Sequence, residues 1–372
     1  MQNFDSKKYY EETLQIIRDL CAIPAPSGME ENRAKYVLDY IKKAGYEDAY
    51  IDNAKNVIWK IDGQIEDCAL FCAHTDTVFP DLTPMPMIED DEYMRCPSVC
   101  DDTASVAILM VISKVLKENN HKPYRTLLMS ANACEEGLGD LKGIKQIFKD
   151  LGSKIKAMCT FDNRYSCVIN KSVGSHRYKI TAITEGGHSF GKFGSRNAIN
   201  VLAKIVTEIY KIEVPKKGDL KTTYNVGTIE GGTSVNTIAQ KAVMYCEYRS
   251  EDRECLAFME KKFNEIFDSV KNDCIELKVE LVGNRPCMGD VDEAELRRIT
   301  DKVKAVQAKY TGLNVVETCA STDCNIPHSL GIPAVDSGTW MGQGSHTREE
   351  YLEKASIIPG LSIAYEVILG EL

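Results

Sequence analysis

The sequence has no Cys-x-x-Cys pair, although it contains 14 cysteines in 372 residues. A structural zinc ribbon uses such pairs and is therefore disfavoured. A chain of this length buries enough core to fold without disulfides. Several cysteines lie inside apolar runs, such as Cys68 and Cys72, where a free thiol behaves as a small hydrophobic side chain. Reduced cysteines predict a cytoplasmic location.

Long hydrophobic runs and an excess of basic residues are also missing. The longest apolar stretch, residues 106–116, is interrupted by Ser113 and Lys114 and is too short to span a bilayer. Residues 1–12 are polar and charged, unlike the apolar segment of a signal peptide. The net charge is −10, so a nucleic acid would have to bind against the protein's own field. We therefore expect neither a membrane nor a nucleic-acid partner.

The length and the hydrophobic pattern predict two folded domains. Hydrophobic residues make up 44% and charged residues 27%, values typical of a globular protein. A domain takes roughly 100–200 residues on average. Up to residue 173, short apolar strands alternate with helices: strands at 68–73, 126–133 and 157–161, and helices at 104–116 and 138–149. This alternation predicts an α/β fold with a mainly parallel sheet.

The pattern changes between residues 174 and 284. Alternating strands and two amphipathic helices follow in the order β-α-β-β-α-β, which is typical of a ferredoxin-like α+β unit. The first pattern then returns, with a helix at 293–310, strands at 313–317 and 332–336, and a closing helix from residue 348. We expect one α/β domain, residues 1–173 and 285–372, and a smaller domain inserted at 174–284.

Histidines and carboxylates collect where the predicted strands end. Only six histidines occur, and His74 follows the first apolar strand directly. Glu135 and Glu136 follow the next strand, and Asp162 the one after it. In α/β sheets functional groups gather beyond the carboxyl ends of the strands, so these side chains are expected close together. Imidazole with carboxylate, and no thiolate in the pattern, suits Zn²⁺, with Mn²⁺ or Co²⁺ as substitutes.

Two further groups complete a set that could hold two metal ions. Asp101 and Asp102 precede a predicted helix, and His346 lies in a glycine-rich loop. Taken singly, an Asp-Asp pair is more often a helix cap, and a Glu-Glu pair a solvated turn. Together they supply a carboxylate to bridge two cations and a second acid to take a proton from water.

Six segments resemble a zinc metallopeptidase superfamily, the one that contains peptidase T, carnosinase, aminoacylase, glutamate carboxypeptidases and succinyl-diaminopimelate desuccinylase. The segments are Ala73-His74-Thr75-Asp76, Cys100-Asp101-Asp102-Thr103, Ala133-Cys134-Glu135-Glu136-Gly137, Phe161-Asp162, Gly187-His188-Ser189 and Ser345-His346-Thr347. They occur in the superfamily's order. The resemblance implies a catalytic metal-binding domain with an inserted domain that serves as lid and dimerisation surface.

The resemblance also implies a metal ligand set. Asp101 would bridge two Zn²⁺ ions in each subunit. His74 and Asp162 would complete one site. Glu136 and His346 would complete the other.

Other residues acquire catalytic and substrate-binding roles from the same resemblance. Glu135 would be the general base. Asp76 would accept a hydrogen bond from the His74 ring nitrogen that does not bind the metal. His188, on the inserted domain, would reach the neighbouring subunit's site and stabilise the oxyanion. Asn236 and Arg249 would hold the polar end of the substrate. The other interpretation of Arg249 is an ordinary surface arginine on a strand.

The resemblance favours an aminopeptidase or a di/tripeptidase acting as a homodimer on small peptides. In that superfamily an aspartate at position 162 is associated with aminopeptidases, and a glutamate with carboxypeptidases and acylases. The alternative within enzymes is an N-acyl-amino-acid amidohydrolase or carboxypeptidase with the same two metals. An inactive homologue acting as a binding module is disfavoured, because the ligands and Glu135 are all present. His121, His176 and His328 match no motif and are interpreted as surface or structural residues.

Overall fold

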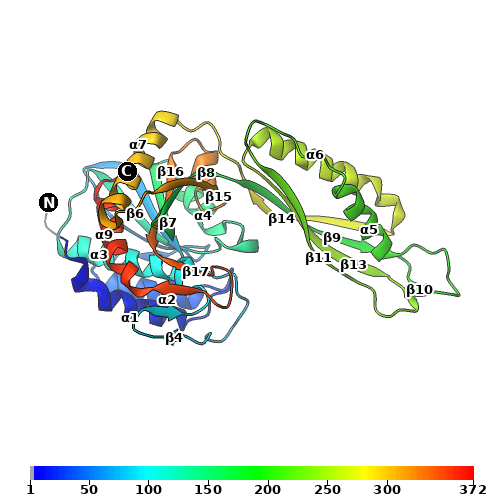
Figure 1. Ribbon diagram of the computed structural model, residues 1–372, viewed down its shortest axis with the longest axis horizontal. Coiled ribbons are helices and arrows are strands. Elements are labelled where there is room, and N and C mark those ends of the chain that lie inside the picture. The colour runs from blue at the N-terminus through cyan, green and yellow to red at the C-terminus, as the bar shows by residue number, and fades with distance from the viewer. Residues whose placement is uncertain (1–3) are drawn as a thin grey trace. The chain divides into compact units, whose positions relative to one another are not determined.

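The computed structural model describes residues 4–372, which form two compact units (Figure 1). Unit 1 contains the described residues up to Ser172 together with Gly289–Leu372, and unit 2 contains Val173–Met288. Each unit has its own main sheet and its own hydrophobic core.

Unit 1 is built on an eight-stranded sheet whose centre is parallel. The inner pairs β6–β3, β3–β7 and β7–β16 are parallel, whereas β1–β2, β2–β6 and β16–β8 are antiparallel. The predicted α/β fold with a mainly parallel central sheet is confirmed. In spatial order the strands are β1 (Tyr50–Ile51), β2 (Val57–Ile61), β6 (Arg125–Asn132), β3 (Ile65–His74), β7 (Ile155–Arg164), β16 (Ala334–Trp340), β8 (Cys167–Ser172) and β15 (Val316–Ala320).

Helices bury the sheet because its central strands are apolar on both faces. In β3, Leu70 and Cys72 share a core cluster with Ile144 and Ile147 of α4 (Lys142–Leu151). Successive side chains of a strand point to opposite faces, so Phe71 packs on the other side, where α3 contacts the strand. The remaining α-helices of unit 1 with more than five residues are α1 (Tyr10–Cys21), α2 (Glu31–Lys43), α3 (Ser105–Glu118), α7 (Glu293–Thr311) and α9 (Ile357–Leu369).

The predicted closing helix is wrong at its start. It was expected from residue 348, but α9 begins at Ile357. Residues Tyr351–Glu353 instead form β18, which pairs with β5 (Tyr93–Arg95) and with β17 (Gly342–Gln343). The reason is the alternation of this segment: Leu352 is fully buried opposite Met94, while its neighbours are half-buried.

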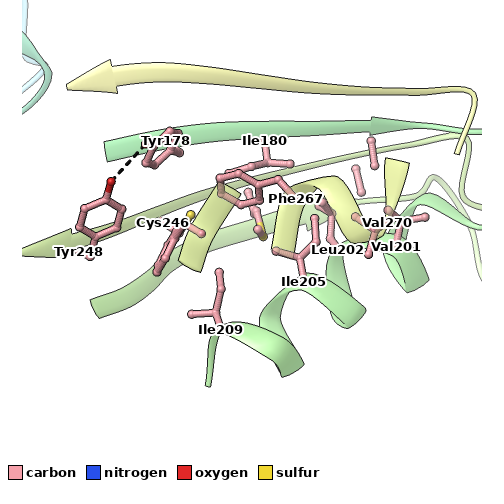
Figure 2. Close-up of a cluster of buried hydrophobic side chains, with 14 of the residues drawn as sticks. Tyr178, Ile180, Val201, Leu202, Ile205, Ile209, Cys246, Tyr248, Phe267 and Val270 are labelled. Atoms are coloured by element: carbon pink, nitrogen blue, oxygen red, sulfur yellow. Dashed lines mark hydrogen bonds between the residues drawn. The ribbon is translucent and has the colours of Figure 1, made fainter. Parts of the chain in front are cut away.

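Unit 2 has the element order β-α-β-β-α-β in its longer elements. Its four-stranded sheet has the order β11-β13-β9-β14 and is antiparallel throughout. Tyr178 and Ile180 of one strand and Cys246 of another pack against Leu202 and Phe267 of the two helices (Figure 2). The elements are β9 (Gly174–Ile183), α5 (Ala198–Ile209), β11 (Thr222–Gly231), β13 (Lys241–Ser250), α6 (Arg253–Ser269) and β14 (Glu276–Arg285), with a short pair, β10 (Gly187–His188) and β12 (Thr237–Ile238).

Two composition-based expectations can be compared with this fold. All 14 cysteines fall within residues 4–372 and are free thiols, and 12 of them are buried. This agrees with the interpretation of the cysteines as small hydrophobic side chains. Over the same residues, the longest and most apolar helices still fall short of what a bilayer crossing would require.

His328, which lies in the short helix α8 (Asn325–Ser329), is a structural residue and is fully buried. Its Nε2 donates to the Ala334 carbonyl (2.8 Å), so Nδ1 is free to accept from the Ser172 hydroxyl (2.7 Å). The His328 carbonyl accepts from the Gly289 N–H (3.0 Å). His328 therefore contacts the ends of both segments that connect to unit 2: Ser172 through its neutral ring and Gly289 through its main-chain carbonyl. Burial lowers the pKa of His328 to about 4.

This pKa predicts a contribution of His328 to stability that depends on pH. The unfolded pKa is about 6.5, so the contribution is complete above that value and is lost as the pH falls toward 4. The difference in free energy of unfolding between wild type and His328→Asn should shrink by about 3 kcal/mol over this range. Urea unfolding at pH 7, 5.5 and 4, in the presence of a chelator, measures this difference. His188→Asn, a substitution of an exposed histidine, is the control. A difference that stays constant with pH would refute the assignment.

Candidate metal centre

His74 stands at the carboxyl end of β3 with its ring buried between acidic groups. Its Nε2 lies 3.0 Å from Asp101 Oδ1 and 3.5 Å from Asp162 Oδ1. On the other side, Nδ1 lies 3.2 Å from the Asp76 carbonyl and 3.4 Å from Asp76 Oδ1. Both Asp76 atoms are acceptors, so Nδ1 carries the hydrogen. Nε2 faces Asp101 and Asp162, and it is the nitrogen that a metal ion would bind in place of its proton.

His346 makes the second half of the centre. Its Nε2 lies 3.0 Å from Glu136 Oε1 and 3.2 Å from Asp101 Oδ2. Glu136 Oε1 is buried and has no hydrogen-bond partner, although the imidazole nitrogen is so close. An imidazole nitrogen and a carboxylate oxygen that converge in this way are the arrangement expected of two ligands of one cation once the ring gives up its proton.

Asp101 lies between the two imidazoles, with Oδ1 toward His74 and Oδ2 toward His346. The structure thus brings together all five residues that the sequence predicted as ligands. Asp102, the other member of the acidic pair, has a contact that the sequence did not predict: its Oδ2 accepts from the His74 N–H (3.0 Å), and its Oδ1 is buried without a partner. Three sets of residues could each hold a metal ion, because the potential ligand atoms within each set lie within 4.8 Å of one another. The sets are His74–Asp102–Asp162, His74–Glu135–Glu136 and Asp101–Glu136–His346.

The charges in this cluster favour the binding of cations. Burial would lower the pKa of His74, but the carboxylates of Asp162 and Asp101 raise it well above its usual value. Asp101 and Glu136 raise the pKa of His346 to about 10. Burial and the charge of Asp101 raise the pKa of Glu136 to about 7. Buried carboxylates and imidazoles that stabilise one another's charges in this way can exchange their protons for divalent metal ions.

Asp76 connects the end of β3 to the turn that follows β6. Its Oδ1 accepts from the Glu135 N–H (2.9 Å), and its Oδ2 accepts from the Glu136 N–H (2.9 Å). The hydroxyl of Ser27 also donates to Oδ2 (2.6 Å). Asp76 is fully buried, so these bonds are shielded from water. Asp76 therefore fixes the backbone of both glutamates as well as the ring of His74, whereas the sequence predicted only the second task.

Glu350 is a residue that sequence reasoning missed. Its buried carboxylate accepts from the N–H groups of Ser98 (2.7 Å), Cys100 (2.9 Å) and Asp101 (3.0 Å). Burial and the charge of Asp101 raise the pKa of Glu350 to about 8, and the three donors act in the opposite direction. The available signal was an acidic residue four positions after His346, which is too common a pattern to be recognised alone.

The three predicted residues of the inserted segment all lie in unit 2. His188 and Asn236 are exposed and lie on neighbouring segments, since the Ser189 N–H donates to the Asn236 carbonyl (2.9 Å) beside the β10–β12 pair. Arg249 is engaged by Glu247, with Nε 2.8 Å from Oε1 and Nη2 3.1 Å from Oε2. The sequence did not indicate this ion pair, which occupies two donors of the guanidinium group.

Comparison with known proteins supports a common fold and a family. The model of "Peptidase family M20/M25/M40" matches residues 70–370. Protein YqjE of Bacillus subtilis is 23% identical, covering 85% of this chain and 84% of YqjE. Carboxypeptidase G2 of Pseudomonas sp. is also 23% identical, covering 84% of this chain and 76% of that enzyme. A tripeptidase crystal structure from Staphylococcus aureus aligns with a TM-score of 0.76 and 22% identity, over 97% of this chain and 98% of that one.

The geometry predicts how metal content responds to substitution. Wild-type protein reloaded with zinc should hold two ions per chain. Asp101→Ala should lose both, because its two oxygens face both imidazoles. Glu136→Gln should weaken zinc binding at one site only. Glu135→Gln, the matched control at the neighbouring residue, should weaken zinc binding at neither site. Elemental analysis after gel filtration gives the stoichiometries. Wild type that never exceeds one ion, with Asp101→Ala binding normally, would exclude a bridging role.

Proposed function

The chain belongs to peptidase family M20/M25/M40, and we propose that it is an aminopeptidase or di/tripeptidase that uses two zinc ions bridged by Asp101. The observation that carries this proposal is the carboxylate of Asp101, which faces His74 with one oxygen and His346 with the other. The free thiols support a cytoplasmic location for the enzyme.

The donor set fits zinc. Two imidazole nitrogens and several carboxylate oxygens converge, and buried Glu136 Oε1 and Asp102 Oδ1 have no hydrogen-bond partner. His74 and Asp162 would hold one ion, and Glu136 and His346 the other. Mn²⁺ and Co²⁺ accept the same donors. When bound, the two ions polarise the scissile carbonyl and make a water molecule acidic enough to attack it at neutral pH.

We assign the general base to Glu135. Its side chain is buried beside His74 and Glu136, and Asp76 holds its main-chain N–H. In this position the carboxylate takes a proton from the attacking water and later gives it to the leaving amine. Glu135→Gln cannot accept that proton, so it should keep its metal ions and lose activity by roughly 10²–10⁴-fold.

We further propose that His188 stabilises the oxyanion in the partner subunit of a homodimer formed through unit 2. His188 is exposed on the short strand β10, whereas Glu135 and the candidate ligands belong to unit 1. Asn236, on the neighbouring segment, and Arg249 would hold the polar end of the substrate. Arg249 donates to Glu247 through Nε and Nη2, and its guanidinium group still has other N–H donors for a substrate carboxylate.

Subunit mixing tests the action of His188 in trans. His188→Ala and Glu135→Gln proteins are each expected to be inactive. Mixed and allowed to exchange, they should regain part of the activity, because some heterodimers contain one site with both residues intact. The control mixes each variant with itself. No recovery despite proven exchange, or a monomeric wild type, would contradict action in trans.

The proposed substrate is a short peptide with a free amino end. Asp162, whose Oδ1 is 3.5 Å from His74 Nε2, is one methylene shorter than glutamate, and in this proposal the space of that methylene receives the substrate amine. An N-acyl-amino-acid amidohydrolase or carboxypeptidase is the second candidate, favoured by Arg249 as a carboxylate anchor and by the similarity to carboxypeptidase G2. Those enzymes would act on N-acyl amino acids or on the carboxyl end of peptides with the same metal centre.

Matched substrates separate these two functions. Zinc-loaded enzyme is assayed on di- and tripeptides and on the same peptides with the amine acetylated. We expect cleavage of the free peptides and at least tenfold lower kcat/KM after acetylation, because a buried polar partner of the amine would be left unpaired. Higher kcat/KM for the acetylated series would establish the amidohydrolase instead. Activity on neither series, with two zinc ions bound, would favour an inactive binding module.

A further inference from the structure

A glutamate from the C-terminal part of the chain holds the backbone of the candidate bridging ligand. We propose that Glu350 is a positioning residue that fixes Asp101 between the two imidazoles. The inference rests on the proposed metal-dependent function. Its basis is that one fully buried carboxylate accepts three main-chain N–H groups, including that of Asp101.

The segment before α3 needs such an acceptor because its backbone departs from helical dihedral angles at several residues. Ser98 has a left-handed conformation (φ 61°, ψ 24°), and Asp101 has φ −97° and ψ 94°. Regular i to i−4 bonds do not form through such residues, so the N–H groups of Ser98, Cys100 and Asp101 need other partners. Cys100 is fully buried, where water does not replace a lost partner. Glu350 satisfies all three donors at once.

The contacts around Glu350 join two segments that are far apart in sequence. The Cys96 N–H donates to the Glu350 carbonyl (3.1 Å), and Cys100 Sγ lies 3.2 Å from the Tyr351 carbonyl. Strand pairing continues this contact, since Tyr351 is opposite Arg95. His346 is on the same segment, four residues before Glu350. One stretch of chain therefore supplies a candidate ligand and also holds the ligand shared by both metal positions.

The chemistry of the clamp requires a carboxylate of this length. Oε1 accepts from Cys100 and Asp101, and Oε2 accepts from Ser98. In Glu350→Gln the amide NH₂ would face an N–H donor, so at least one bond would be replaced by a repulsive contact. Glu350→Asp keeps both oxygens but withdraws them by one methylene. Neither change removes an atom that contacts the candidate metal positions.

Zinc affinity is the direct measure of this positioning. Competition with a chromophoric chelator is carried out on wild type, Glu350→Gln and Glu350→Asp. Loss of a group that orients a ligand weakens metal binding by about 10–100-fold. Both variants should show this loss for both ions, because Asp101 serves both. At saturating zinc, kcat should fall while KM changes little, because Glu350 contacts the main chain of the candidate ligand Asp101 and has no proposed contact with the substrate.

Asp292→Asn is the matched control. Asp292 also accepts two main-chain N–H groups, those of Ala294 (2.9 Å) and Glu295 (3.0 Å), but it caps α7. The Asp292→Asn protein should bind zinc with the same affinity as wild type. If Glu350→Gln does not fold, Glu350→Asp decides the result.

The outcomes separate this inference from the proposed function. Folded Glu350 variants with wild-type zinc affinity and wild-type kcat would overturn the inference, whatever the enzyme cleaves. Weakened zinc binding in the variants, with a wild type inactive on all peptides and acylated compounds, would support the inference and refute the function.

Discussion

Every candidate role in this protein depends on how one carboxylate is held. Asp101 presents one oxygen to His74 at 3.0 Å and the other to His346 at 3.2 Å. Two cations bound on either side of this carboxylate would repel each other, and the negative charge between them offsets that repulsion. If Asp101 shifted, one imidazole would lose its shared partner, and the centre would separate into two weaker sites. The surrounding structure restrains this carboxylate from several directions.

The parallel sheet and two buried acids provide this restraint. The ends of β3, β6 and β7 bring His74, Glu135, Glu136 and Asp162 to one edge of the sheet. Asp76 then fixes the glutamate turn, and Glu350 accepts the N–H of Asp101. Both acids act on main-chain groups, so they set the path of the chain before any metal ion binds. Such preorganisation keeps ligands in place that would otherwise repel one another.

Much of the fold and most of the centre could be predicted from the sequence. Apolar strands buried on both faces have a clear signal, and each ligand after a strand end had a motif around it. The roles of Glu350, Ser27 and Asp102 were missed because each bonds a main-chain group or a side chain that only folding brings close. The helix predicted from residue 348 failed for the same reason: pairing of β18 with β5 is a contact between distant segments.

The central claim is that two metal ions share the carboxylate of Asp101. Anomalous diffraction from zinc-loaded crystals, measured on both sides of the zinc edge, locates each ion independently of any activity. The account predicts two peaks about 3.5–4 Å apart, one on the His74 side of Asp101 and one on the His346 side. A single peak, or two peaks of which only one contacts Asp101, would contradict it.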